Sequence, residues 1–422
     1  MKRIFNILAI ALLAVACDDT VGDSPNATYS PQVNVALPDS LAAGTVQSEK
    51  FEVRNVSTGR TTTFSSRQDL KLTVGLYDVT YEAEVLLADS LHHVTAYTQS
   101  VEVTANRQEI NLQAFESLVN DDFIISEIFF SGTLQPSGNQ YYGDDYVKIY
   151  NNTDHVLYAD GLTLVESQFL TTQKYNYTPD IMDQAMTVQA IYTIPGSGKD
   201  HPVQPGEELI LADTGIDHRV ANPNSFDLSK ADFEWYDVSS QPAHMDIDSP
   251  TVPNLDKWYC YTLSFFVLHN RGFRAYALAR IPIDKEEYLK NYRYTYDYTI
   301  IVEAGTFPMS RTAYKLPNKW IVDAVNCSVA AKYVWNVTTP SLDRGWTYCG
   351  TVDKDKTRYF HSVRRKMLYL KDGKPYLQDT NNSSADFNPE CIASEIERQG
   401  TAIDVSGTKC TTRTYDGVTP MK

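Results

Sequence analysis

The sequence has no excess of positive charge. Its 37 Lys and Arg residues stand against 53 Asp and Glu residues, which gives a formal net charge of −16 at pH 7. Contacts to phosphates need a positive face, so this balance argues against a nucleic-acid-binding protein. One basic stretch, Arg364-Arg365-Lys366 followed by Lys371 and Lys374, is the local exception. Because apolar residues alternate around it, we interpret this stretch as the solvated face of a strand.

Signatures of common enzymes are also missing. The sequence has no G-x-S-x-G nucleophile elbow, no H-E-x-x-H helix and no cysteine-protease motif, which argues against a hydrolase. The segment 195–200 ends like a phosphate-binding loop, but Thr193 replaces its first glycine and Asp200 replaces the residue that binds magnesium. We therefore expect a loop between strands there, and we expect no cofactor.

Cysteine is scarce, with 6 residues, and none has the spacing of a zinc site. Five lie beyond the first seventeen residues: Cys260, Cys327, Cys349, Cys391 and Cys410. An odd number leaves at least one of them without a partner in the chain, although a compartment outside the cytoplasm permits disulfides. Proximity in the sequence makes Cys327 and Cys349 the favoured pair.

Long apolar runs are confined to the N-terminus. Lys2 and Arg3 precede the apolar residues 4–16, a run too short to span a bilayer but typical of a signal peptide over residues 1–16. It ends in Ala14-Val15-Ala16-Cys17, which resembles the lipobox of bacterial lipoproteins. The resemblance implies that the Cys17 thiol carries diacylglycerol, so that acyl chains anchor the mature protein to a membrane.

Residues 17–29 are polar and aperiodic, which predicts a flexible tether after the lipidated cysteine. Asp18 and Asp19 resemble the surface-export signal of Bacteroidetes-type lipoproteins. The resemblance implies an outer-membrane location facing the cell exterior, with the periplasmic face as the alternative.

The remaining chain is long enough for two or three domains, and its 28 tyrosines lean towards β structure. Over residues 30–115, apolar residues alternate with polar ones in short segments such as Val33, Val35 and Leu37, which predicts a β-sandwich. Residues 74–79, Val-Gly-Leu-Tyr-Asp-Val, resemble carboxypeptidase-regulatory or immunoglobulin-like accessory domains. Such domains are commonly spacers.

Residues 121–420 carry three segments, 125–128, 144–151 and 157–164, whose order resembles the lamin-tail domain, an immunoglobulin-like β-sandwich. Segments at about 166–200 and 213–310 are extra. That pattern resembles an uncharacterised family of Bacteroidetes lipoproteins often found beside outer-membrane receptors. We therefore expect an all-β fold with short helical insertions, over residues 284–292 and over 389–400, where Asn388 is the expected cap.

Two clusters that contain acidic residues are candidates for catalysis or for metal binding. Asp144 and Asp145 begin an expected strand beside a glycine-rich loop, so we interpret them as solvated side chains and not as a catalytic pair. His244, Asp246 and Asp248 could bind a divalent cation, but they lack EF-hand spacing. We interpret them as a solvated loop and expect no metal site.

Aromatic residues in the extra segments are the most suggestive feature, because Tyr and Trp are enriched at binding surfaces. The candidate ligand-binding residues are Tyr175, Tyr177, Trp235, Tyr236, Trp258 and Tyr259. Each could equally belong to a core or a sheet surface.

The first hypothesis is therefore a non-enzymatic lipoprotein that binds an outer-membrane receptor or transporter and its nutrient, a glycan or an iron compound. A cell-surface hydrolase with a site built from the insertions is one alternative. A structural envelope protein is another.

Overall fold

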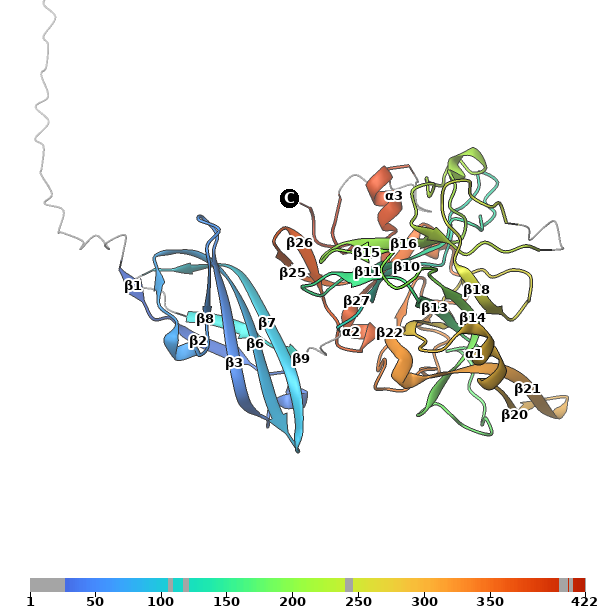
Figure 1. The fold of residues 1–422 in the computed structure, drawn as a ribbon, viewed down its shortest axis with the longest axis horizontal. Coiled ribbons are helices and arrows are strands. Elements are labelled where there is room, and N and C mark those ends of the chain that lie inside the picture. The colour runs from blue at the N-terminus through green and yellow to red at the C-terminus, as the bar shows by residue number, and fades with distance from the viewer. Residues whose placement is uncertain are drawn as a thin grey trace, which may run out of the picture. The chain divides into compact units, whose positions relative to one another are not determined.

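The computed structural model describes residues 27–104, 109–116, 121–239, 246–401, 409 and 413–421. The predicted signal peptide, Cys17, most of the tether, His244 and Cys410 lie outside these residues. The chain divides into two compact units, Met1–Phe115 and Glu116–Lys422 (Figure 1). In the described part, no helix is both long and apolar enough to cross a membrane.

In its described residues, the first unit consists of strands and two short 3-10 turns. The strands are β1 (Thr28–Tyr29), β2 (Gln32–Ala36), β3 (Thr45–Asn55), β4 (Thr61–Phe64), β5 (Leu72–Thr73), β6 (Gly75–Leu87), β7 (Ser90–Val103), β8 (Glu109–Gln113) and β9 (Phe115–Glu116). A five-stranded sheet of order β4-β3-β6-β7-β9 carries most of the unit, and the β2–β8 and β1–β5 pairs are separate. Phe51 packs on Tyr81 with ring centroids 4.9 Å apart, and Val33, Val53 and Ile110 bury against the same core. The alternation in the sequence therefore marks the residues that face the core.

The second unit contains two large sheets (Figure 1). The six-stranded sheet has the order β17-β16-β11-β10-β24-β27. Its strands are β10 (Ile124–Phe129), β11 (Tyr146–Tyr150), β16 (Glu208–Ala212), β17 (Phe233–Glu234), β24 (His361–Arg365) and β27 (Phe387–Ile392). The eight-stranded sheet has the order β20-β21-β14-β13-β19-β22-β23, with β18 also paired to β14. Its strands are β13 (Leu162–Ser167), β14 (Ala185–Thr193), β18 (Asp256–Cys260), β19 (Ala275–Arg280), β20 (Arg293–Val302), β21 (Gly305–Pro317), β22 (Ile321–Ser328) and β23 (Thr347–Tyr348).

The main core of the second unit draws side chains from both sheets. Ile128 of β10 and Val147 of β11 belong to the same buried cluster as Leu164 of β13 and Leu278 of β19. Two sheets that share one apolar core form a sandwich. Two small two-stranded sheets complete the described strands: β12 (Leu157–Tyr158) pairs with β15 (Pro202–Val203), and β25 (Met367–Lys371) forms a hairpin with β26 (Lys374–Leu377). The predicted all-β fold is confirmed.

Three short helices occur among the described residues: α1 (Lys285–Asn291), α2 (Ser383–Asp386) and α3 (Ser394–Gln399). The helix expected over 284–292 is present, and the Asp284 side chain caps it by accepting a hydrogen bond from Glu287 N at 2.8 Å. The helix expected over 389–400 is only partly correct. Gly400 does end α3 with φ of 60°, but Asn388 and Pro389 lie in β27, whose pairing with β24 overrides the local helix signals.

The favoured Cys327–Cys349 disulfide is absent. Among the described residues, the cysteines Cys260, Cys327, Cys349 and Cys391 are buried and free. The register explains why the favoured pair does not form. Cys327 lies opposite Thr347 in the parallel β22–β23 pair, so Cys349 falls two positions farther along the chain.

Candidate functional site

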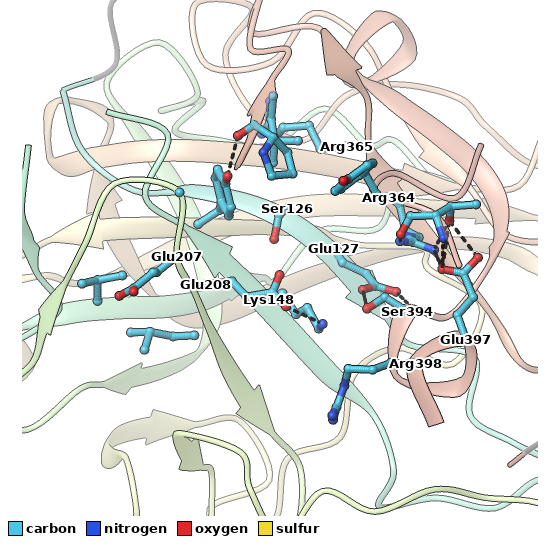
Figure 2. A pocket seen from close by; sticks show the side chains of 18 of the residues that line it. Ser126, Glu127, Lys148, Glu207, Glu208, Arg364, Arg365, Ser394, Glu397 and Arg398 are labelled. Atoms are coloured by element: carbon cyan, nitrogen blue, oxygen red, sulfur yellow. Dashed lines mark hydrogen bonds and ion pairs between the residues drawn. The ribbon is translucent and has the colours of Figure 1, made fainter. Parts of the chain in front are cut away.

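The outer face of the six-stranded sheet holds a pocket of about 610 Å³, here called the basin (Figure 2). Strands β10, β11, β16 and β24 supply its floor. The residues that surround it come from β26, from α3 and from residues 413–421. The basin is therefore assembled from segments far apart in the sequence.

Strand alternation sends apolar and polar side chains to opposite faces of this floor. In β11, Val147 and Ile149 enter the core, whereas Lys148 and Tyr150 line the basin. Every residue of β11 is nevertheless buried. The polar face of the strand is covered by protein and not by water.

A β-bulge in β10 shapes the centre of the floor. The register between β10 and β11 shifts between Ile125 and Glu127, and Ser126 lies at the shift. Bulges re-aim side chains and are common beside functional sites. Ser126 lines the basin, is 9% exposed, and its Oγ has no hydrogen-bond partner. This hydroxyl is available to a bound molecule.

Lys148 crosses the floor in a fully formed ion-pair network. Its Nζ lies 2.8 Å from Glu208 Oε1 and 2.9 Å from Glu395 Oε1. Burial alone would lower the pKa of Lys148, but the two carboxylates outweigh it and raise the pKa. Burial would raise the pKa of Glu395, whereas Lys148 and Arg398 lower it to about 2. Both groups are therefore charged at neutral pH, and together they tie α3 to the sheet.

Glu127 makes a second attachment of α3. It accepts hydrogen bonds from Tyr146 Oη at 2.9 Å, from Ser362 Oγ at 2.6 Å and from Ser394 N at 2.8 Å, and it also accepts one from Ser394 Oγ. Figure 2 shows Glu127 beside Ser394 at the edge of the basin. With these lone pairs used, Glu127 holds the first turn of the helix in place.

The basic stretch at 364–366 corrects the sequence-based interpretation. Arg364 and Arg365 are buried, with 4% and 2% exposure, and are not a solvated face. The Arg364 guanidinium lies 2.9 Å from the Glu397 carboxylate. Arg365 binds Asp323 at 2.7 Å and Asp379 at 3.1 Å, which joins β24 to β22 of the other sheet. Ion pairs therefore compensate the two positive charges that the sequence pattern predicts to be exposed to water.

The described residues that line the basin include equal numbers of acidic and basic side chains. Its acidic side chains are Glu127, Glu207, Glu208, Asp232 and Glu397. Its basic side chains are Lys148, Arg364, Arg365, Arg398 and Arg413. Five of each sign stand beside apolar or aromatic surface from Tyr150, Leu377 and Met421. Such a surface offers many hydrogen-bond donors and acceptors, but its charges cancel and do not attract an ion of either sign.

The six aromatic residues proposed from the sequence lie outside the basin. Tyr175 and Tyr177 are half-buried and meet each other edge to face at 6.0 Å within a larger aromatic cluster. Trp258 packs on Tyr288, and Tyr259 packs on Tyr314 with centroids 4.5 Å apart. These contacts lie on the outer face of the eight-stranded sheet, where they cover the apolar residues below.

Trp235 and Tyr236 follow β17. Trp235 is fully buried and packs on Phe266 in the main core, so a surface contact is not open to it. Tyr236 is half-buried. The structure thus packs Tyr177, Trp258 and Tyr259 against one cluster of the eight-stranded sheet and gives Trp235 a packing role in the main core.

The acidic pair Asp144 and Asp145 is not solvated, contrary to expectation. Both side chains are buried, because the loop after β10 folds back over them and Thr133 binds Asp144. Asp246 lines a small pocket near this pair, whereas Asp248 is exposed and accepts a hydrogen bond from Asn254 at 3.0 Å. Among the described residues, no group of three or more His, Cys, Asp or Glu side chains is arranged to hold a metal ion.

Comparisons with known proteins agree on an uncharacterised family. Residues 204–394 match the model of the family "Protein of unknown function (DUF4876)". The solved structure of a DUF4876 family protein from Bacteroides thetaiotaomicron VPI-5482 is similar to this chain, with a TM-score of 0.57 and 18% sequence identity over 87% of this chain and 96% of that chain. None of the curated proteins compared with the chain matches it. The likeness shows a shared fold with a protein of a Bacteroides species.

Proposed function

We propose that the protein is a lipid-anchored, non-enzymatic binding protein of the outer membrane, and that its basin takes a neutral polyhydroxylated ligand such as a glycan. The lipobox-like Cys17 and the acidic pair after it support the location. The likeness to a Bacteroides protein supports the type of organism in which such signals operate. A transporter or receptor beside it in the membrane would receive the ligand.

We infer the class of ligand from the equal numbers of acidic and basic side chains that line the basin. An anion would meet five carboxylates, and a cation would meet five basic side chains. Sugar hydroxyls both donate and accept hydrogen bonds, so they can use the two kinds of group together. Met421, which lines the basin and is 39% exposed, offers an apolar surface to the C–H face of a sugar ring.

A glycan also fits better than an iron compound. The carboxylates of Glu127 and Glu397 already accept hydrogen bonds from serine hydroxyls or from arginine. Lone pairs used in this way are not free to coordinate a metal. The hydroxyl of Ser126 remains, because it has no hydrogen-bond partner among the described residues.

The change Ser126→Ala separates binding from folding. Its hydroxyl makes no hydrogen bond to the part of the chain that the structure describes, so removing it leaves the unfolding midpoint unchanged or slightly higher. If the hydroxyl binds ligand, affinity for a neutral oligosaccharide falls about 2- to 10-fold. The full-length protein in detergent is screened against neutral and anionic oligosaccharides, and the best binder is titrated by calorimetry.

Ser310→Ala is the matched control, because Ser310 is exposed on β21. We expect it to bind like the wild type. Saturable binding of anionic compounds without binding of neutral ones would contradict the charge-balance argument. Equal affinities of Ser126→Ala and the wild type would place the ligand elsewhere.

A further inference from the structure

A second pocket, of about 240 Å³, lies in the same unit outside the basin. Tyr141, Tyr142 and Phe265 supply aromatic wall, and Asp213, Asp246 and His218 supply its polar groups. No residue is shared with the basin. The volume is small for a drug-sized ligand and suits a single chemical group.

Two buried carboxylates, those of Asp213 and Asp145, lie in and beside this pocket with one oxygen each left without a hydrogen bond in the described part of the chain. Asp213 is 2% exposed and Asp145 is 1% exposed, and Oδ1 of each has no hydrogen bond of good geometry among the described residues. Burial and the neighbouring acids Asp246, Asp237 and Asp144 raise the pKa of Asp213, whereas the side chain of Trp235 lowers it. Asp144 differs, because Ser225 Oγ donates to it at 2.6 Å. Leaving a buried acceptor unpaired carries a desolvation penalty, which a bound donor would remove. Asp213 lines the pocket and therefore presents its carboxyl to an occupant.

The neighbouring bases do not compensate these acids. His218 Nε2 lies 2.8 Å from the Thr214 carbonyl, which only accepts, so Nε2 carries the proton and Nδ1 accepts from Tyr141 Oη at 3.0 Å. Burial lowers the pKa of His218, which keeps the ring neutral. Lys257 Nζ is bound to Asp237 at 2.6 Å. Among the described residues, the lining of this pocket holds two carboxylates and no Lys or Arg side chain.

We propose that this pocket binds a primary alkylammonium group, with Asp213 as its counter-ion and the aromatic rings as its walls. An ammonium group brings three donors and one charge to a carboxylate with an open acceptor. Tyr and Phe faces attract such a cation. A free amine and a lysine side chain present the same group.

Other cations fit less well. Calcium takes six to eight oxygen ligands, whereas no described group of three carboxylates or histidines is arranged around a common point. A guanidinium binds best to a carboxylate with both oxygens free in a fork. Oδ1 of Asp213 and Oδ1 of Asp145 are buried, so neither carboxylate presents both oxygens to such a fork.

Calorimetry on the full-length protein at pH 7.5 tests this site with n-butylammonium chloride and with N-acetyl-lysine amide. Neutral butanol and calcium chloride are the comparison probes. We expect saturable binding of both ammonium probes, and none of butanol. The Asp213→Asn variant loses about 10- to 100-fold in affinity, because a hydrogen bond to a charged group is lost. Asp256→Asn, at an exposed position of β18, keeps wild-type affinity.

A second variant guards against a folding defect in Asp213→Asn. Tyr142 is 53% exposed, so Tyr142→Leu removes part of the aromatic wall without disturbing the core. We expect it to weaken butylammonium binding about 2- to 5-fold. The proposal is overturned if calcium binds while the ammonium probes do not, if no probe binds, or if Asp213→Asn binds butylammonium like the wild type.

Discussion

Replacement of Arg365 by methionine is expected to lower the free energy of unfolding of the second unit by about 3–5 kcal/mol. The guanidinium binds Asp323 and Asp379 and donates to the Ile125 carbonyl at 2.7 Å. Methionine fills similar volume but leaves three buried carboxyls, those of Asp323, Asp379 and Asp386, without their cation. The loss of charge compensation, and not a cavity, sets the cost.

The five tryptophans of the chain all lie in the second unit, so intrinsic tryptophan fluorescence during urea unfolding reports on that unit alone. Arg311→Met, at an exposed position of β21, is the control and should cost less than about 0.5 kcal/mol. A cost below about 1 kcal/mol for Arg365→Met would show that the buried ion pairs are not needed.

The pH dependence gives a further check on the same variant. Burial raises the pKa of Asp323, and Arg365 opposes that rise. Without Arg365, the folded state binds protons more tightly than the unfolded state, so the variant regains stability as pH falls. The difference from the wild type should therefore be larger at pH 8 than at pH 5. A constant difference across this range would argue against uncompensated carboxyls as the cause.

Replacement of Cys17 by serine is expected to move nearly all of the protein from the membrane fraction to the soluble fraction. Each buried methylene contributes about 0.8 kcal/mol, so loss of two or more acyl chains removes far more than the free energy needed for stable anchoring. Fractionation of cells followed by immunoblotting measures the shift, and incorporation of labelled palmitate checks the modification itself.

Cys260→Ser is the matched control for Cys17→Ser, because Cys260 is buried in the second unit and should have no part in anchoring. Its protein should stay in the membrane fraction and keep its label. If the Cys17→Ser protein remained with the lipid, the proposed anchor and the location inferred from it would both be wrong. Digestion of intact cells by protease then distinguishes the outer face from the periplasmic one.

Local sequence pattern predicted the inward side of the sheets well. The alternation of Val147 and Ile149 marks the core face of β11, and it did so without knowledge of the partner strands. The opposite face could not be assigned in the same way. Lys148 and Arg364 alternate with apolar residues just as solvated residues do. They are buried because α3 and residues 413–421 cover that face, and these segments come from elsewhere in the chain.

The basin was missed for this reason. Its residues Ser126 and Glu208 lie inside segments that the sequence marks only as strands. The signal that could have helped is the lysine at the centre of β11, since a lone cation in a fully apolar context needs a partner. The aromatic residues of the insertions were instead proposed from the sequence as the ligand-binding residues. Trp235 shows why composition misled, because a large ring serves a core as well as a surface.

The four buried cysteines have a consequence for life in an oxidising setting. Burial raises the pKa of Cys391 to about 12 and raises the pKa of Cys260, Cys327 and Cys349 as well. Thiol–disulfide exchange and oxidation proceed through the thiolate, which these groups rarely form. If the protein is displayed outside the cell, these four thiols resist mispairing in the native state. Oxidation of these thiols is then expected in the chain before it folds.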